Sequence, residues 1–187
     1  MERTSNIYKL VMTALIMGLI MLATSTFRIP SPFTQGYVHL GDTMIFLGVL
    51  VLGKKHGTVA AGIGSALADV MAGYAIYAPW TLIIKGLMAF VMAAFIEAMS
   101  GRSKANLRIA GLPVIELIGM VLAGIVMAAG YCIVDGVLAG NMISGLLGVP
   151  ANIGQFAVGM ILASALAAAL YKTPAKRWFA YRLDEVK

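Results

Sequence analysis

The sequence predicts an all-α membrane protein with six transmembrane helices and with both termini on the cytoplasmic side. Of the 187 residues, 60% are hydrophobic and only 12% are charged, whereas charged residues make up about 25% of a typical soluble protein. The mean hydropathy is +0.91. Six apolar runs follow one another along the chain, and at roughly 20 residues per span they account for most of its length. We therefore expect one integral membrane domain over residues 1–187.

The six apolar runs predict the helices one by one. Short polar, Gly-rich or Pro-rich stretches separate the runs. The expected helices cover residues 10–25, 41–53, 58–73, 81–99, 113–138 and 151–171. The first run also resembles a cleaved signal peptide, but the charge pattern favours its retention. The third run is rich in Ala, Gly and Ser, which allow close helix approach in lipid, so we expect it to be central.

Lysine and arginine residues are distributed unevenly among the connections. The net charge of +6 by itself suggests a nucleic-acid partner, but with cytoplasmic termini all except Arg28 and Lys85 of the 14 basic residues fall on the cytoplasmic side. Such a bias is the usual signature of orientation. It predicts that the loops 26–40, 74–80 and 139–150 lie together on the outside, the first and last of them irregular because of their Pro and Gly content.

Several charged residues lie within these apolar runs, where a charge is costly and usually functional. Asp69 and Lys85 flank the loop 74–80, and we expect either an ion pair between their helices or a role in binding a ligand; Lys85 can also extend toward the outer surface. Asp135 is expected near the same outer face. Glu97 and Glu116 are expected near the inner ends, beside basic residues or solvent.

Aromatic and amide side chains gather near the same outer loops. Tyr74, Tyr77 and Trp80 fit either an interfacial aromatic belt or the walls of a pocket for a small ring. Asn152 and Gln155 are three residues apart and share a helix face, where amides either join helices or contact a ligand.

The loop 26–40 ends in a further group of polar side chains. Tyr37, His39 and Asp42 follow one another within six residues. Asp42 suits the first turn of a helix, where the helix dipole favours an acid, and His39 or Asp42 can instead face a ligand.

Other chemical signals are weak. The stretch GVLVLGKK (48–55) fits the pattern G-x-x-x-x-G-K but lacks the following Ser or Thr and lies in an apolar helix, so we do not expect it to bind nucleotide. His39, His56 and Cys132 lack metal-ligand spacing. We predict no cofactor, no metal and no catalysis. Two rival classes remain, a membrane enzyme using Asp69, Lys85 and His39 as acids or bases, and a stand-alone carrier or channel.

Two stretches resemble a known family. The outer loop ends YVHLGD (37–42), and the sequence ADVMAGYAIYAPWTLIIKG (68–86) follows the pattern ADxxxGYxxYxPxTxIIKG. In these stretches and over almost its whole length, the chain resembles the S-component of an energy-coupling factor (ECF) vitamin transporter, in the branch that spans riboflavin, hydroxymethylpyrimidine and pyridoxine. The resemblance implies a six-helix S-component bundle in a prokaryotic cell membrane that binds a vitamin at its extracellular side.

The resemblance also implies partners and site residues. An S-component works with a transmembrane coupling protein (T-component) and two cytoplasmic ATPases, which hydrolyse the ATP, and it is thought to topple in the membrane with its ligand. Small residues of the first helix contact the coupling protein in this family; here they match Ala14 and Gly18, with Gly18 in place of the usual Ala. The vitamins that the resemblance favours are hydroxymethylpyrimidine and pyridoxine, with riboflavin as the alternative. The expected vitamin-binding residues are Tyr37, His39, Asp42, Tyr74, Tyr77, Lys85, Asn152 and Gln155.

Overall fold

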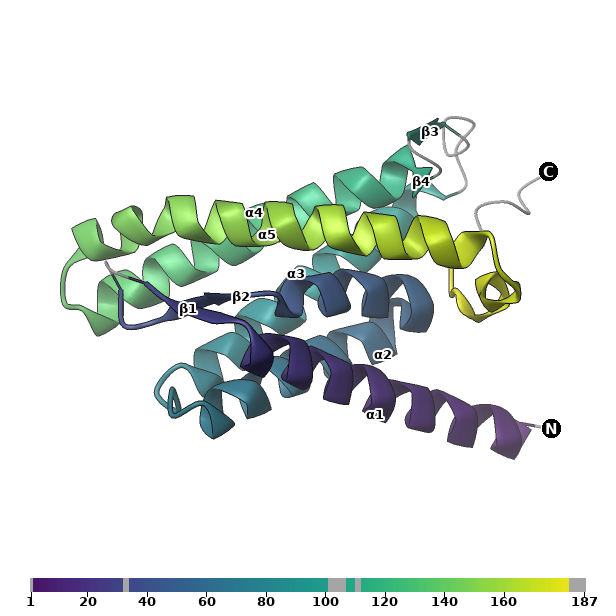
Figure 1. Cartoon of the computed structure of the whole chain (residues 1–187), viewed down its shortest axis with the longest axis horizontal. Helices are drawn as coiled ribbons and strands as arrows, with labels where there is room; N and C mark the ends of the chain where they lie inside the picture. The colour runs from purple at the N-terminus through teal and green to yellow at the C-terminus, as the bar shows by residue number, and fades with distance from the viewer. Residues whose placement is uncertain (1, 32–33, 101–106, 110–111, 182–187) are drawn as a thin grey trace.

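Five long helices form most of this computed structural model, which describes residues 2–31, 34–100, 107–109 and 112–181, with side chains from residue 6. In Figure 1 they lie roughly along one common direction. All five are long and apolar enough to cross a membrane, so the predicted all-α membrane class is confirmed, whereas the predicted count of six is not. The helices are α1 Glu2–Thr26, α2 Gly41–Met71, α3 Ala78–Met99, α4 Val114–Leu138 and α5 Met142–Tyr171.

Helix α2 covers the whole of the helix predicted at 41–53 and most of the one predicted at 58–73. It is interrupted at Gly53, whose φ of 72° lies in the left-handed region that glycine adopts easily. The chain reverses direction at Gly53. The evidence is that a Cβ on Gly57 would lie only 3.1 Å from the Cα of Val49, whereas eight residues of a straight helix would separate the two by about 12 Å. The predicted turn at 54–57 is wrong: these residues are helical, and Gly53 alone makes the turn.

The loop predicted as irregular at 26–40 contains a β-hairpin. Strands β1 Arg28–Pro30 and β2 Tyr37–His39 pair antiparallel, with Ile29 opposite Val38. A second short pair, β3 Arg108–Ile109 and β4 Leu112–Pro113, precedes α4.

Many basic residues of the predicted inner segments are described, but Arg102, Lys104, Arg182 and Lys187 lie outside the described residues.

The outer loop predicted at 139–150 is almost entirely helix. Helix α5 begins at Met142, and Pro150 lies inside it. The side chain of Asn141 accepts a hydrogen bond from the backbone N–H of Ile143 at 3.0 Å and so caps the helix N-terminus. The prediction failed because it treated the Gly and Pro residues of this stretch as helix breakers. A proline is nevertheless tolerated inside a membrane helix when neighbouring groups bond the freed backbone.

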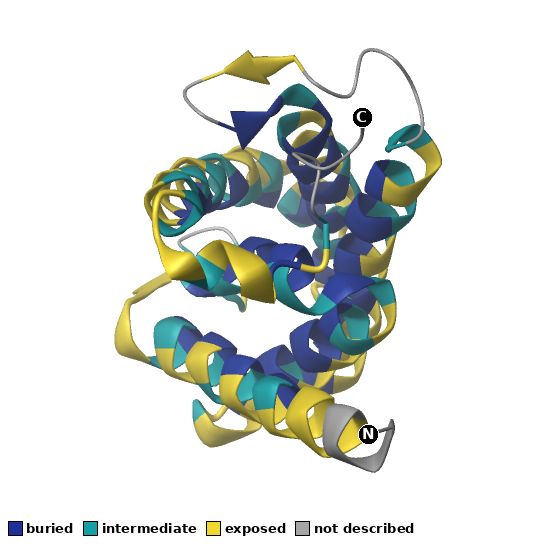
Figure 2. Cartoon of the chain, turned by 90° about the vertical axis from the view of Figure 1, so that its right-hand side faces the viewer, coloured by how far each residue is buried: buried dark blue, intermediate teal, exposed yellow. Residues whose placement is uncertain are grey.

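Helix α2 packs against α1, α3 and α5, in keeping with the central position expected for the run 58–73. A Cβ on Gly62 would lie 2.8 Å from the backbone oxygen of Leu82 in α3, and one on Gly64 would lie 2.8 Å from that of Met17 in α1. Figure 2 shows buried residues on the faces that meet and exposed residues on the outward faces. Many of those exposed residues are large and apolar, as expected for helices that face lipid.

The two ends of the bundle are built differently. The cavity end, at the left of Figure 1, comprises the β1–β2 hairpin, both termini of α2, the start of α3, the α4–α5 connection and the start of α5. The tail end comprises the Gly53 turn, the β3–β4 pair and the 3-10 helix η2 Pro174–Trp178. After η2 the chain packs back onto the bundle: Phe179 is 3% exposed, and the N–H of Ala180 donates to the carbonyl of Leu50 at 2.9 Å.

Candidate ligand-binding site

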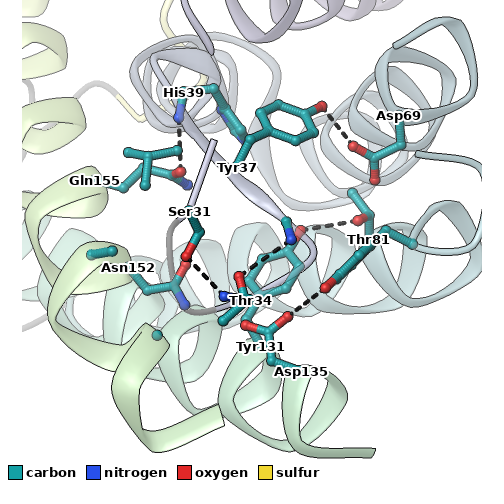
Figure 3. Close-up of a pocket in the computed structure, with 15 residues that line it drawn as sticks. Ser31, Thr34, Tyr37, His39, Asp69, Thr81, Tyr131, Asp135, Asn152 and Gln155 are labelled. Atoms are coloured by element: carbon teal, nitrogen blue, oxygen red, sulfur yellow. Dashed lines mark hydrogen bonds between the residues drawn. The ribbon is translucent and has the colours of Figure 1, made fainter. Parts of the chain in front are cut away.

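A small polar cavity lies at the cavity end, beneath the β1–β2 hairpin (Figure 3). Its space for water-sized solutes is about 40 Å³, room for only a few water molecules. A ring-sized ligand therefore needs the covering segment to move outward. The residues that line the cavity come from the hairpin and all helices except α1: Ser31, Thr34, Gly36, Tyr37, Val38, His39, Asp69, Tyr77, Thr81, Tyr131, Asp135, Gly148, Ala151, Asn152 and Gln155.

Two tyrosine hydroxyls each donate to a carboxylate that lines the cavity. The hydroxyl of Tyr37 donates to Oδ1 of Asp69 at 2.7 Å, which ties strand β2 to the end of α2. The hydroxyl of Tyr77, just before α3, donates to Oδ1 of Asp135 in α4 at 2.8 Å. Burial and the bonded carboxylate raise the pKa of both Tyr37 and Tyr77, so both hydroxyls remain protonated donors.

Lys85 forms its ion pair with Asp42, not with Asp69. Its Nζ lies 2.5 Å from Oδ1 of Asp42, and both side chains are fully buried. The interpretation of an Asp69–Lys85 pair is therefore wrong, because the Gly53 reversal brings Asp42 to the same end of the bundle as Asp69. Lys85 also lies over the ring of Tyr131, 5.4 Å from its centroid, and so behind the cavity wall.

A chain of hydrogen bonds continues from this pair toward the hairpin. The amide nitrogen of Gln155 donates to Oδ2 of Asp42 at 2.9 Å, and the amide oxygen of Gln155 accepts from the N–H of His39 at 3.0 Å. The N–H of Gly41 donates to Nδ1 of His39 at 3.0 Å. Burial and the positive charge of Lys85 lower the pKa of His39 to about 3, so this ring is neutral and acts as an acceptor.

The predicted binding residues all lie at the cavity end, some in the cavity wall and the others behind it. Tyr37, His39, Tyr77, Asn152 and Gln155 line the cavity. The others lie behind them: Asp42 and Lys85 belong to the buried network, and the ring of Tyr74 packs on that of Tyr37 with centroids 4.6 Å apart.

The sequence interpretation missed several lining residues. Thr81 and Tyr131 share a hydroxyl–hydroxyl hydrogen bond of 3.0 Å across the cavity wall. Tyr131 precedes Asp135 by four residues and thus lies on the same helix face, a spacing that could have revealed it. Ser31 and Thr34 were hidden because the hairpin was predicted as an irregular loop.

The two predicted partner-interface residues lie on a free face of α1. Ala14 is exposed and Gly18 is partly exposed, and a Cβ on Gly18 would meet nothing within 4 Å. No described helix of this chain covers that face.

A wide apolar groove opens between α1 and α5. Leu22, Phe27 and Leu162 are among the residues that line it. An adjoining hollow, which shares Phe27 with the groove, is lined in part by His39 and Gln155. The groove differs in chemistry from the cavity, since its walls are almost entirely apolar.

The fold and the cavity together define a class: a helical membrane protein with a small polar site, covered by a hairpin, at one end. The chain belongs to the family of ECF-type riboflavin transporter S components, whose family model matches residues 4–172. The recognition of an ECF S-component from the sequence is thereby confirmed, and with it the assignment to a family of vitamin-transport subunits rather than of enzymes.

The proteins similar to this chain include two relatives and two solved structures. An uncharacterized protein of Pyrococcus woesei is 40% identical over 119 residues, covering 64% of this chain and 72% of that protein. The thiamine precursor transporter HmpT of Lactococcus lactis is 29% identical, covering 90% of each chain. The S-component for biotin from an ECF-type ABC transporter has a TM-score of 0.70 at 17% identity, with 92% of this chain and 95% of that chain covered. The S component of a bacterial ECF transporter has a TM-score of 0.64 at 16% identity, with 89% and 97% covered.

Proposed function

We propose that this chain is the high-affinity vitamin-binding subunit of an ECF-type ABC importer in a prokaryotic cell membrane, and that its substrate is hydroxymethylpyrimidine or pyridoxine. The observation that carries the proposal is the polar cavity under the β1–β2 hairpin, in a chain of this family. The cavity contains tyrosine rings for stacking and placed polar groups for orientation, the combination typical of small-ligand sites.

Within this proposal the predicted binding residues act in two ways. Tyr37, His39, Tyr77, Asn152 and Gln155 would face the ring, since they line the cavity. Tyr74 would hold Tyr37 in place through its ring contact. Asp42 and Lys85 would position Gln155 from behind.

The choice among vitamins is supported by similarity and by size. The similarity to HmpT extends over 90% of each chain, which favours the thiamine-precursor pyrimidine. Riboflavin is the second candidate, because the matching family is described as a riboflavin transporter component. Neither ring system fits the cavity of about 40 Å³, but the three-ring system of riboflavin would require a larger outward movement of the β1–β2 hairpin than a single ring would.

We further propose six membrane crossings with both termini in the cytoplasm. Each half of α2 would cross separately, since Asp42 and Asp69 lie at the cavity end while Gly53 lies at the tail end beside Ala180. The first half, residues 41–52, is only about 18 Å long at 1.5 Å per residue, so it would span part of the membrane. The basic residues Lys54, Lys55, Lys172, Lys176 and Arg177 follow the Gly53 turn or α5, which favours a cytoplasmic tail end.

Partner subunits would supply the energy. The proposed partners are a transmembrane coupling protein and two ATPases, and this chain itself would catalyse no reaction. The free face of α1 around Ala14 and Gly18 suits the coupling protein, because small residues allow close helix contact. The double variant Ala14→Leu/Gly18→Leu should lose copurification with the coupling protein yet bind the vitamin normally. Copurification unchanged in this variant would exclude α1 as the docking face.

The substrate proposal is tested by finding what the protein carries. Mass spectrometry of the purified protein should detect a pyrimidine or pyridine vitamin, and calorimetry should show tight binding of it. The variant Gly148→Val should weaken binding at least tenfold, since a Cβ there would lie 2.9 Å from Cγ2 of Thr34 and 3.2 Å from Oδ2 of Asp135. The matched control is Gly154→Val on the same helix, where a Cβ meets nothing within 4 Å.

Two results would contradict the proposal. One is the absence of affinity for hydroxymethylpyrimidine, pyridoxine and riboflavin alike. The other is uptake of the solute into vesicles by this chain alone, without ATPase subunits, which would make it a stand-alone carrier.

A further inference from the structure

The cavity has more acidic groups than basic ones. Asp69 and Asp135 both line it, and no Lys or Arg does among the described residues. His39 is neutral, because its pKa is lowered to about 3. Lys85 is within electrostatic range of Asp69, but its ammonium is paired with Asp42. Arg28 is exposed and lies 5.9 Å from the centroid of the Tyr37 ring, so water screens its charge.

Asp69 presents an unused acceptor atom. The residue is only 4% exposed, and its Oδ1 is bonded to Tyr37. Its Oδ2 is buried and accepts no hydrogen bond of standard geometry within the part of the chain that the structure describes. The hydroxyl of Thr81 is close enough to stabilise the charge of Asp69, but that hydroxyl is shared with Tyr131. A buried acceptor without a partner is costly, so this atom suits a donor that arrives from outside.

Asp135 also bonds a tyrosine, on the other side of the cavity (Figure 3). It is 5% exposed, and Tyr77 occupies its Oδ1. Its Oδ2 lies beside Gly148, where a Cβ would come within 3.2 Å of the oxygen, so the glycine leaves this side of the oxygen uncovered. In Figure 3 Tyr131 and Thr34 lie near it, and Asn152 lies on the adjoining wall.

From these two carboxylates we infer the chemical class of ligand that the site takes, an inference that rests on the proposed function. The ligand is a single-ring heterocycle that is neutral or cationic and carries hydrogen-bond donors at two edges, one for Oδ2 of Asp69 and one for Oδ2 of Asp135. An exocyclic amino group or a protonated ring nitrogen suits one carboxylate, and a hydroxymethyl group suits the other. Carboxylate-bearing and phosphorylated vitamins are excluded, since they would bring a further negative charge into a buried acidic site.

The test compares matched ligands and matched variants by calorimetry. The probe is 4-amino-5-hydroxymethyl-2-methylpyrimidine, and the variants are Asp69→Asn and Asp135→Asn, which keep the shape and the bond to each tyrosine. Each should lose affinity at least tenfold, because a hydrogen bond to a charged group is replaced by one to a neutral group. The control is Glu116→Gln, a buried tyrosine-bonded carboxylate at the tail end, which should bind within twofold of the unmodified protein.

Ligand analogues test the same inference without changing the protein. The pyrimidine without its amino group should bind at least tenfold more weakly, and the phosphate ester should not bind at a hundredfold higher concentration. Because the analogues are measured on the unmodified protein, they test the inference even if an Asn variant fails to fold.

The possible failures are distinguishable. Suppose that the unmodified protein binds the pyrimidine tightly, that the Asn variants bind it equally well, and that the analogue without the amino group and the phosphate ester bind as tightly as the pyrimidine. The inference is then wrong, while the proposed function stands. If no vitamin binds at all, the proposed function fails and the inference fails with it.

Discussion

Both ends of the bundle contain tyrosine hydroxyls bonded to carboxylates. At the cavity end Tyr37 bonds Asp69 and Tyr77 bonds Asp135. The tail end has two such pairs: Tyr171 bonds Glu116 at 2.8 Å, and Tyr181 lies 3.4 Å from Glu97.

The ends differ in how the carboxylates are neutralised. At the tail end Glu97 forms an ion pair with Lys54, and Arg108 is within electrostatic range of Glu116. At the cavity end Lys85 is paired with Asp42 and is only within electrostatic range of Asp69. Asp135 has a tyrosine bond but no cationic partner among the described residues. The space also differs, since the chain around Phe179 packs onto the tail end whereas the other end is hollow. The comparison indicates that the tail end is a structural closure and the cavity end a site.

The largest expected effect comes from removing the buried cation of the cavity end. Lys85→Met leaves Asp42 buried without its ion-pair partner, which should lower the free energy of unfolding by about 3–5 kcal/mol. Chemical unfolding in detergent measures the effect. The double variant Lys85→Met/Asp42→Asn should recover much of the loss, and a single variant as stable as the unmodified protein would show that the pair contributes nothing.

The next effect tests the closure of the tail end. Phe179→Ala removes a buried ring that packs on Tyr171 with centroids 4.5 Å apart and should cost about 3 kcal/mol of stability. Vitamin affinity should stay unchanged, because the cavity lies at the other end. The neighbouring Trp178→Ala is the control, since Trp178 is 48% exposed. Weakened binding in Phe179→Ala would contradict the separation of the two ends.

Acid should destabilise the cavity end through His39. Its pKa is about 3 in the folded protein and about 6.5 in the unfolded chain, so between these values the unfolded chain binds the extra proton and stability falls as the pH falls. From pH 7 to pH 5 this group should cost about 2 kcal/mol. His39→Asn keeps an acceptor for the N–H of Gly41 and should reduce the loss, as thermal unfolding at both pH values would measure. Equal losses in both proteins would mean that His39 does not titrate in this way.

The smallest effect is expected at the exposed pair of the tail end. Lys54 and Glu97 have side chains that are 39% and 40% exposed, so Lys54→Ala should change stability by less than about 1 kcal/mol. A loss as large as that of Lys85→Met, measured in the same unfolding experiment, would remove the distinction between the two ends.

Much of the fold was predictable from the sequence because lipid imposes simple rules. Long apolar runs had to be helices, and the starts or ends of the later helices were placed within a few residues, as at Val114 and Tyr171. The Gly53 turn was harder, because a reversal at a single glycine leaves almost no loop to detect. The start of α5 was missed because local Gly and Pro content was given more weight than helix continuity.

The candidate site was predictable in position but not in pairing. The predicted topology placed Tyr37, Tyr77 and Gln155 at one end of the bundle, and they line one cavity there. Which aspartate bonds Lys85 depends on the depth and rotation of three helices, which periodicity does not give. The hairpin residues Ser31 and Thr34 depend on backbone pairing between two strands of three residues each, too short for a pattern to indicate.

The most direct measurement is a structure of the protein with 4-amino-5-hydroxymethyl-2-methylpyrimidine bound. The account predicts the ring beneath the β1–β2 hairpin, with one donor group within hydrogen-bond distance of Asp69 and another within that distance of Asp135. A ligand found instead in the apolar groove between α1 and α5, or at the tail end, would contradict it.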